Sequence, residues 1–379
     1  MSVPESVQDE IKNVSVVTIL HGEKEFIPLI LNNFQNFNDF NKKENLELIV
    51  VDDGSENLMK YFMDTERCMY LHLKNEEKES FMKQIFEGYK QPNKTVLQYE
   101  QKRKALPNGF KRDYGCGMSS HDTLFHMNAD CIYNPKSIER KLNFMKRTSA
   151  ECVFCDSTLC YDIYNKELYK TVSPFKIYES TLCHTREFWK RRGFQWSDVT
   201  NEGKYFHHDN GIDRKLDNYY DTIQILSIHN MNEYQPVKVE LENMKIKIPE
   251  MVNEITIDTH PFCTYISELF EGDVTILGIN SDFLDNVDTE SHWKTHNLTE
   301  KWKQTKLAKM VKNIGSEFNV LLYGSKHPAW DLFNHVPFDV IFLETPKNRE
   351  QMIEIISKCK SHEYISVKGI FLRKEFLEK

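Results

Sequence analysis

The stretch LELIVVDDGS, residues 46–55, decides which fold this chain can adopt. Its first six positions are mostly apolar and end in isoleucine and two valines, which is typical of a strand buried on both faces in a parallel sheet. Two aspartates, a glycine and a serine then indicate a tight loop before a helix. In sheets of this kind ligands bind outside the carboxyl ends of the strands, so Asp52 and Asp53 are candidate ligand-binding residues.

Apolar strands and helical patterns alternate on both sides of this stretch. The segments predicted as strands are residues 14–20, 69–73, 95–98 and 123–127, and those predicted as helices are residues 25–37, 80–89 and 110–118. This alternation predicts an α/β layer with a mostly parallel sheet. Three short polar segments follow predicted strands, namely residues 21–23, 52–54 and 128–130. Their shared position predicts that they contribute to one site.

A second region is predicted after a charged, proline-terminated linker at residues 239–249. The expected domains are therefore residues 1–238 and a smaller α/β domain over residues 250–379. Predicted strands in the latter are residues 273–278, 319–323 and 339–343, and predicted helices are residues 298–314 and 349–358. The region lacks both G-x-G-x-x-G and a P-loop. Acceptor binding, oligomerisation and an independent enzyme activity all stay open for it.

The composition excludes several classes of protein. The 379 residues carry a net charge of −8, so no basic excess is present to hold nucleic acid. No run of about 18 apolar residues indicates a membrane span, and the polar, acidic N-terminus is unlike a signal peptide. Nine cysteines without a disulfide-like pattern indicate a reducing compartment, so a cytoplasmic location is expected. Abundant lysine and asparagine suggest an AT-rich genome, such as that of a large virus or a parasite.

Three ordered segments together resemble the family 2 glycosyltransferases and their GT-A fold. They are residues 14–27, residues 47–55, and residues 108–115 followed by residues 128–135. The resemblance covers about residues 14–235. It implies an inverting, hexosyltransferase-type enzyme that moves a sugar from a nucleotide-sugar, with UDP favoured, to a hydroxyl of a glycan or other acceptor. A catalytically degenerate module that only binds a nucleotide-sugar is the alternative. A nucleotidyltransferase would need a glycine-rich opening loop, which residues 21–24 lack.

A nucleotide-binding set follows from the resemblance. A carboxylate at a strand end, Asp53, can accept the imide N–H of a uracil-like base. The alternative is that Asp52 and Asp53 cap the following helix. Lys111 and Arg112 would neutralise phosphate charge, or else lie on a solvated helix face. The implied nucleotide-binding residues are Ile19, His21, Glu23, Asp53, Lys111, Arg112 and Asn128.

A divalent cation, Mn²⁺ or Mg²⁺, is expected at the diphosphate because carboxylate oxygens and phosphates suit these ions. The resemblance assigns Asp130 and His229 to this metal. The D-x-D-like motif departs from the family pattern because Asn128 stands at the first acidic position, although its amide oxygen could still be a ligand. A polar turn at Asp130 and a structural role for His229 are the alternatives.

The expected general base is Asp209, which would take the proton of the acceptor hydroxyl. His208 precedes it where the family typically has Glu, and Asp213 is the reserve candidate. A helix N-cap is the alternative for Asp209. The aromatic residues Trp189 and Trp196 could form a sugar platform or fill a core.

Overall fold

The computed structural model describes residues 13–40, 46–88, 94–155, 157–163, 166–172, 178–199, 202–206, 213–215, 222–226, 237–239, 248–253, 255, 269–270, 274–279, 293–298, 318–323, 338–343, 357, 359, 361–367, 370–373 and 375–376. The chain forms two compact units. The first comprises residues 1–90, 105–225 and 236–256, and the second comprises residues 91–104, 226–235 and 257–379.

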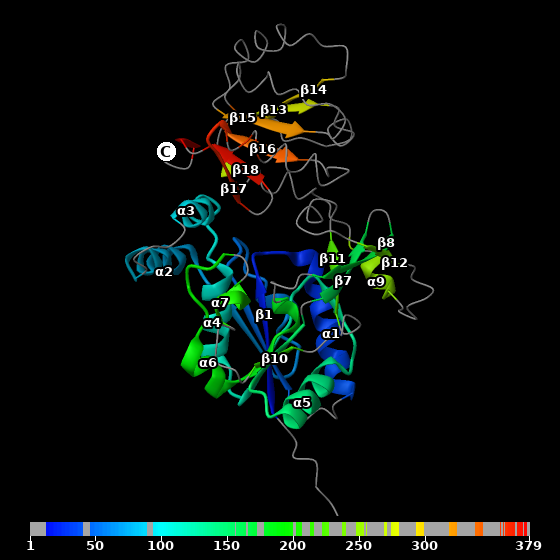
Figure 1. The fold of residues 1–379 in the computed structure, drawn as a ribbon. Coiled ribbons are helices and arrows are strands. Elements are labelled where there is room, and N and C mark those ends of the chain that lie inside the picture. The colour runs from blue at the N-terminus through cyan, green and yellow to red at the C-terminus, as the bar shows by residue number, and fades with distance from the viewer. Residues whose placement is uncertain are drawn as a thin grey trace, which may run out of the picture. The chain divides into compact units, whose positions relative to one another are not determined.

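The first unit is built on a seven-stranded, mostly parallel sheet in the order β10-β6-β9-β4-β1-β2-β3 (Figure 1). Its strands are β1 (Val14–Leu20), β2 (Leu46–Asp52), β3 (Cys68–His72), β4 (Thr123–His126), β6 (Cys152–Phe154), β9 (Cys183–Thr185) and β10 (Asp213–Lys215). The neighbouring strands β4, β1, β2 and β3 are parallel, whereas β9 is antiparallel to both β4 and β6. The predicted α/β class with a mostly parallel sheet is confirmed.

Helices cover both faces of this sheet. They are α1 (Ile27–Phe40), α2 (Asn75–Gly88), α4 (Asn108–Met118), α5 (Ser137–Thr148), α6 (Arg186–Arg192) and α7 (Glu202–Phe206), with the 3-10 turns η1 (Lys24–Phe26), η2 (Met59–Tyr61) and η3 (Glu179–Thr181). In Figure 1, α1 and α5 lie on one side of the sheet and α4 and α6 on the other. Gly115 of α4 packs directly on β1, since a Cβ there would lie 2.6 Å from Val17 Cγ1. Both faces of β1 are therefore buried, as its apolar run predicts.

A smaller antiparallel sheet in the order β12-β8-β7-β11-β5 completes the first unit. Its members are β5 (Cys131–Tyr133), β7 (Ser157–Asp162), β8 (Glu167–Val172), β11 (Thr222–Leu226) and β12 (Val237–Val239). The short helix α9 (Glu250–Asn253) contributes Val252 to the core of this sheet, where it meets Leu29 of α1 and Leu159 of β7. The sheet begins directly after residues 128–130, so it borders the polar end of β4.

The second unit contains α3 (Lys94–Lys102) and a six-stranded sheet in the order β14-β13-β15-β16-β18-β17. Its strands are β13 (Val274–Ile279), β14 (Trp293–Leu298), β15 (Phe318–Tyr323), β16 (Val340–Leu343), β17 (Tyr364–Val367) and β18 (Ile370–Arg373). The three strands predicted in this region are confirmed, but β14, β17 and β18 were not predicted. The helices predicted over residues 298–314 and 349–358 lie almost entirely outside the described residues.

One predicted strand is wrong, because residues 95–98 belong to helix α3. The short window Thr-Val-Leu-Gln has β-branched residues, but good helix formers follow it up to Lys102. The longer segment therefore favours the helix. None of the described helices combines the length and the apolar character that crossing a membrane requires.

Candidate functional site

The loops after β1 and β2 meet at the carboxyl edge of the large sheet. The register pairs Leu20 with Asp52, so the next residues of both strands lie side by side. Gly22 has a φ of +86°, a backbone conformation that favours glycine. A Cβ on Gly54 would lie 2.6 Å from the Cα of Gly22. The two loops therefore touch backbone to backbone.

Asp52 holds these loops together. Its Oδ1 accepts the N–H groups of Gly22 at 3.0 Å and Gly54 at 2.9 Å. Its Oδ2 accepts the hydroxyl of Tyr70 at 2.6 Å, and that hydroxyl accepts the N–H of Leu58 at 2.8 Å. Every contact of this carboxylate is internal, so Asp52 shapes the site.

Asp53 is the centre of a buried charge cluster. Its Oδ1 accepts hydrogen bonds from Lys111 Nζ at 2.9 Å and from His21 Nδ1 at 3.0 Å, and its Oδ2 accepts the N–H of Leu106. Burial alone would raise the pKa of this carboxyl. The positive charges of Lys111 and His21, with the hydrogen bonds from His21 and Leu106, instead hold it well below its ordinary value. Asp53 is therefore ionised in the folded protein.

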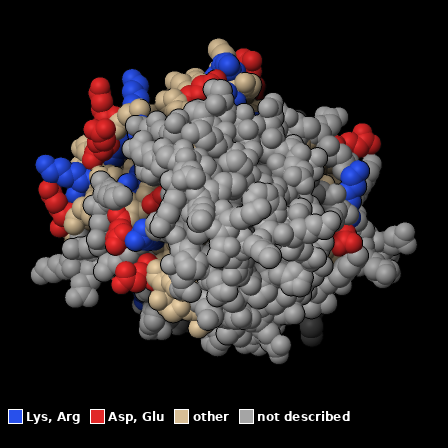
Figure 2. All heavy atoms as spheres, turned by 90° about the horizontal axis from the view of Figure 1, so that it is seen from above, with Lys and Arg blue, Asp and Glu red and all other residues tan. Residues whose placement is uncertain are grey.

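Two lysines converge on this cluster. Lys111 also donates to the carbonyl of Leu20 at 3.2 Å, and Lys78 of α2 donates to the carbonyl of Asp53 at 2.8 Å. Both side chains are buried. Sequence reasoning missed Lys78, which stands alone among acidic residues at the start of its helix. Elsewhere, on the face in Figure 2, acidic and basic side chains of described residues lie next to one another. The two lysines thus place positive charge beside the ionised carboxylate of Asp53.

The remaining predicted residues of this loop lie nearby. Ile19 is partly buried on β1 and pairs with Val51 of β2. Glu23 accepts the backbone N–H of His21 through its Oε2, which fixes the loop that carries the imidazole. Ile19, His21, Glu23, Asp53 and Lys111 are thus brought together at the ends of β1 and β2.

Arg112 lies on the buried face of α4 and reaches the end of β4. It donates through Nη2 to Asn128 Oδ1 at 2.9 Å and through Nε to Glu202 Oε1 at 2.7 Å. Burial opposes its charge, but the Glu202 carboxylate keeps the pKa of the guanidinium above its ordinary value. Only 2% of the side chain is exposed, so Arg112 acts on Asn128 and Glu202 rather than on solvent. Asp130 is partly buried beside Cys131, whose Sγ lies 3.5 Å from Asp130 Oδ1.

Carboxylates crowd behind Arg112. Burial and the nearby Glu202 raise the pKa of Glu179 to about 7, and the same two causes raise that of Asp198 to about 7. Glu179 accepts the N–H of Gly203 at 3.0 Å. Asp198 Oδ2 is buried without a hydrogen-bond partner. Sequence reasoning missed all three carboxylates, although a buried arginine on α4 requires a counter-charge.

Asp113, the next residue on α4, accepts hydrogen bonds from three aromatic residues. Its Oδ1 accepts the indole N–H of Trp189 at 2.7 Å and the backbone N–H of Phe194 at 3.0 Å, and its Oδ2 accepts the indole N–H of Trp196 at 2.8 Å. Trp196 also packs edge-on against Phe110. Both indoles are thus tied to the interior of the first unit.

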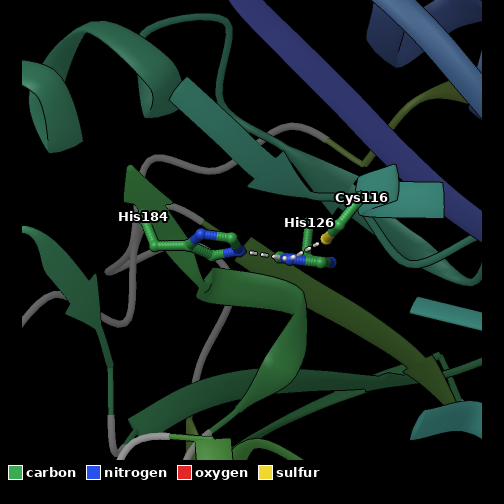
Figure 3. Close-up of side chains that lie close together, drawn as sticks. All are labelled: Cys116, His126 and His184. Atoms are coloured by element: carbon green, nitrogen blue, oxygen red, sulfur yellow. Dashed lines mark hydrogen bonds between the residues drawn. The ribbon is translucent and has the colours of Figure 1, made fainter. Parts of the chain in front are cut away.

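Cys116, His126 and His184 form a buried group whose three ligand atoms lie within 4.8 Å of one another (Figure 3). It is the only such group of three among the described residues, and Asp130 is not part of it. Its donor set of one thiol and two imidazoles could hold a metal ion. Burial raises the pKa of the Cys116 thiol well above its ordinary value, which disfavours the thiolate that a metal would need.

Three predicted residues cannot be placed with the rest. Asp209 and His229 lie outside the described residues, and of Asp213 only the backbone, in β10, is described. The described structure therefore brings together the residues predicted to bind a nucleotide, and Asp130 follows Asn128 at the end of β4.

The comparisons with known proteins give distant structural likenesses. No family model and no curated protein matches the chain. The structure of S. aureus TarS 1–349 with UDP-GlcNAc is 12% identical, covers 69% of this chain and 67% of its own, and has a TM-score of 0.38. Another structure of S. aureus TarS 1–349 covers 57% of this chain and has a TM-score of 0.34; the match spans 58%, less than two thirds, of that chain. The mannosyltransferase PcManGT from Pyrobaculum calidifontis, with GDP-Man and Mn²⁺, is 12% identical, covers 57% of each chain and has a TM-score of 0.35. Likenesses of this size do not establish function.

Proposed function

We propose that this protein is a glycosyltransferase with a GT-A-like domain that moves a sugar from a nucleotide-sugar, most simply a UDP-sugar, to an acceptor hydroxyl. One observation carries the proposal: the polar ends of β1, β2 and β4 share one edge of the parallel sheet. The register pairs Val17 with His126, so residues 128–130 follow β4 beside the loop that follows β1. Sheets of this type bind ligands at that edge.

The base and ribose are assigned to the loop after β1. His21 is partly exposed, and the buried carboxylate of Asp53 orients its ring. Asp53 is fully buried and its Oδ2 accepts the Leu106 N–H, so its proposed role toward the base is to orient His21, the more exposed partner. Lys111 supplies the positive charge that keeps Asp53 ionised.

The diphosphate is assigned to the end of β4, where Asn128 and Asp130 are both partly exposed. Asp130 would hold a Mn²⁺ or Mg²⁺ ion, together with His229. Such an ion stabilises the charge that develops on a departing diphosphate. Asp209 would take the proton of the acceptor hydroxyl in a single displacement that inverts the anomeric centre.

A module that binds a nucleotide-sugar without transferring the sugar is the second candidate. The observation that favours it is that Asn128 directs its amide oxygen to Arg112. Among the described residues at the end of β4, Asp130 is then the one carboxylate proposed as a metal ligand. A weakened metal site would slow departure of the diphosphate while leaving the base subsite intact.

A donor screen distinguishes these proposals. Release of UDP or GDP from a panel of sugar nucleotides is measured with Mn²⁺, with Mg²⁺ and with EDTA, for the unaltered protein, Asp130→Ala, Asp209→Ala and the control Asp122→Ala. Asp122 is exposed just before β4, at the opposite end of that strand. The transferase predicts losses of about 100-fold or more in the first two variants and none in the control. UDP-dependent thermal stabilisation without turnover would support the binding module. A protein that shows no binding and no turnover would overturn both proposals.

A further inference from the structure

A chain of hydrogen bonds runs through the interior from β9 to Asn128. His184 Nδ1 lies 2.9 Å from the carbonyl oxygen of Thr185, and His184 Nε2 lies 2.9 Å from His126 Nε2. Arg112 Nη1 lies 3.4 Å from His126 Nδ1, and Arg112 Nη2 lies 2.9 Å from Asn128 Oδ1. Both histidines and Arg112 are buried.

The groups at the two ends of this series of hydrogen bonds fix which atom donates and which accepts in each of them. A carbonyl oxygen only accepts, so His184 carries its proton on Nδ1 and accepts through Nε2. His126 must then donate from Nε2, which leaves its Nδ1 as an acceptor. A guanidinium only donates, and Arg112 faces that Nδ1. Burial, with the nearby charge of Arg112 on His126, lowers the pKa of both rings, to about 4 for His184, so the neutral forms that this pattern requires are favoured.

The same pattern of donors and acceptors disfavours a metal ion at Cys116, His126 and His184. A metal on His126 Nε2 would move the ring proton to Nδ1, where it would face the N–H of Arg112. Two donors would then oppose each other in a buried position, which carries a desolvation cost. The group in Figure 3 is therefore better explained as the inner part of the hydrogen-bond chain.

The outer end of the chain fixes the orientation of the Asn128 amide. Since Arg112 needs an acceptor, the amide oxygen points inward and the NH₂ group points away. The Nδ2 atom has no hydrogen bond to a described residue and is not among the buried polar atoms without partners. The backbone N–H of Asn128 is held by the Tyr133 hydroxyl at 2.9 Å, and that hydroxyl donates to the carbonyl of Ser180. The amide is thus held on the inside and accessible on the outside.

We propose that Asn128 is a hydrogen-bond donor to a phosphate oxygen of the bound nucleoside diphosphate, rather than a metal ligand, and that Arg112 is the residue that positions it. The inference rests on the proposed function, since it assumes a nucleoside diphosphate at this edge. An NH₂ group suits an anionic oxygen, whereas a metal needs the oxygen that Arg112 already occupies. Nucleotide binding at this site should then depend less on a metal ion than binding at a site with two carboxylates.

The test measures UDP and GDP affinity by calorimetry, in EDTA and in Mn²⁺, for the unaltered protein, Asn128→Asp, Arg112→Lys and the control Ser120→Ala. Ser120 is exposed and follows the C-terminal end of α4. Asn128→Asp keeps an acceptor for Arg112, so the fold is retained, but it turns a carboxylate toward the phosphate. We expect its affinity in EDTA to fall about 10-fold or more and to recover with Mn²⁺. Arg112→Lys keeps the charge but not the forked geometry, and its metal-free affinity should fall while its affinity in Mn²⁺ changes less.

A second measurement does not depend on a folded variant. Selective ¹⁵N-asparagine labelling gives the side-chain NH₂ resonances of the unaltered protein, among which that of Asn128 should shift on addition of UDP in EDTA. Equal metal-free affinities of Asn128→Asp and the unaltered protein, or an unmoved Asn128 resonance at saturating UDP, would overturn the inference and leave the proposed function standing. If the unaltered protein binds neither UDP nor GDP with or without metal, the proposed function fails instead.

Discussion

The ammonium group of Lys111 lies 2.9 Å from Asp53 Oδ1, and neither side chain is more than 4% exposed. Replacing Lys111 by Met leaves the Asp53 carboxylate buried with less compensation. The expected loss is about 3–5 kcal/mol in the free energy of unfolding, measured with urea. The double variant Lys111→Met with Asp53→Asn should recover part of it. Lys190→Met, in an exposed ion pair with Glu187, should change stability by less than about 1 kcal/mol. Equal effects at both lysines would contradict a buried pair.

The contact between the first two loops gives a steric prediction. A methyl group on Gly54 would meet the backbone of Gly22 at 2.6 Å, and backbone cannot yield as a side chain can. Gly54→Ala should cost on the order of 1–3 kcal/mol and weaken UDP binding, because the loop bearing His21 must shift. The matched control is Gly88→Ala at the end of α2, where an added Cβ would meet nothing within 4 Å. A wild-type melting temperature for Gly54→Ala would show that the loops do not touch.

Glu179 should impose a pH dependence on stability. Its pKa is raised to about 7 by burial and by Glu202, so between roughly pH 4.5 and 7 the folded state binds more protons than the unfolded state. Stability contributed by the protonated form is therefore lost as the pH rises through that window. Glu179→Gln should match the unaltered protein at pH 4.5 and exceed it at pH 8 by on the order of 1–3 kcal/mol. Urea midpoints at both pH values give the comparison, with Glu139→Gln on the exposed face of α5 as the neutral control.

Asp113 should report on the packing of two tryptophans. Asp113→Ala removes the acceptor of both indole N–H groups and of the Phe194 N–H. Three lost hydrogen bonds should cost about 2–4 kcal/mol, and tryptophan emission should move to longer wavelength as the indoles become solvated. Glu187→Ala, on the exposed face of α6, should change neither quantity. Unchanged emission together with lost transfer activity would instead make the indoles part of a sugar platform.

The inner strands could be predicted because burial on both faces leaves little choice of residue. The runs 14–20 and 46–51 are nearly all apolar and β-branched, and they form β1 and β2. The hairpin of β7 and β8 was not predicted, since its strands STLCYD and ELYKTV lack a strict alternation of apolar and polar residues. The segment 95–98 failed because four residues are too few to separate strand from helix.

The location of the site residues at the strand ends could be predicted, but their interaction partners could not. Asp52 and Asp53 are adjacent and chemically identical in the sequence, yet one closes the loops and the other pairs with Lys111. Lys111 and Arg112 could have lain on a solvated face of α4, and nothing local shows that both are buried. Glu202 pairs with Arg112 across 90 residues of chain, a distance over which local patterns carry no information.

The backbone contact between Gly22 and Gly54 also constrains how this molecule can diversify. With no side chain between them, neither loop has slack to absorb a change in the other. A larger residue at Gly22 or Gly54 would require the backbone of the other loop to rearrange. Across homologous sequences the two positions should therefore vary together, and donor preference should be altered through paired rather than single exchanges.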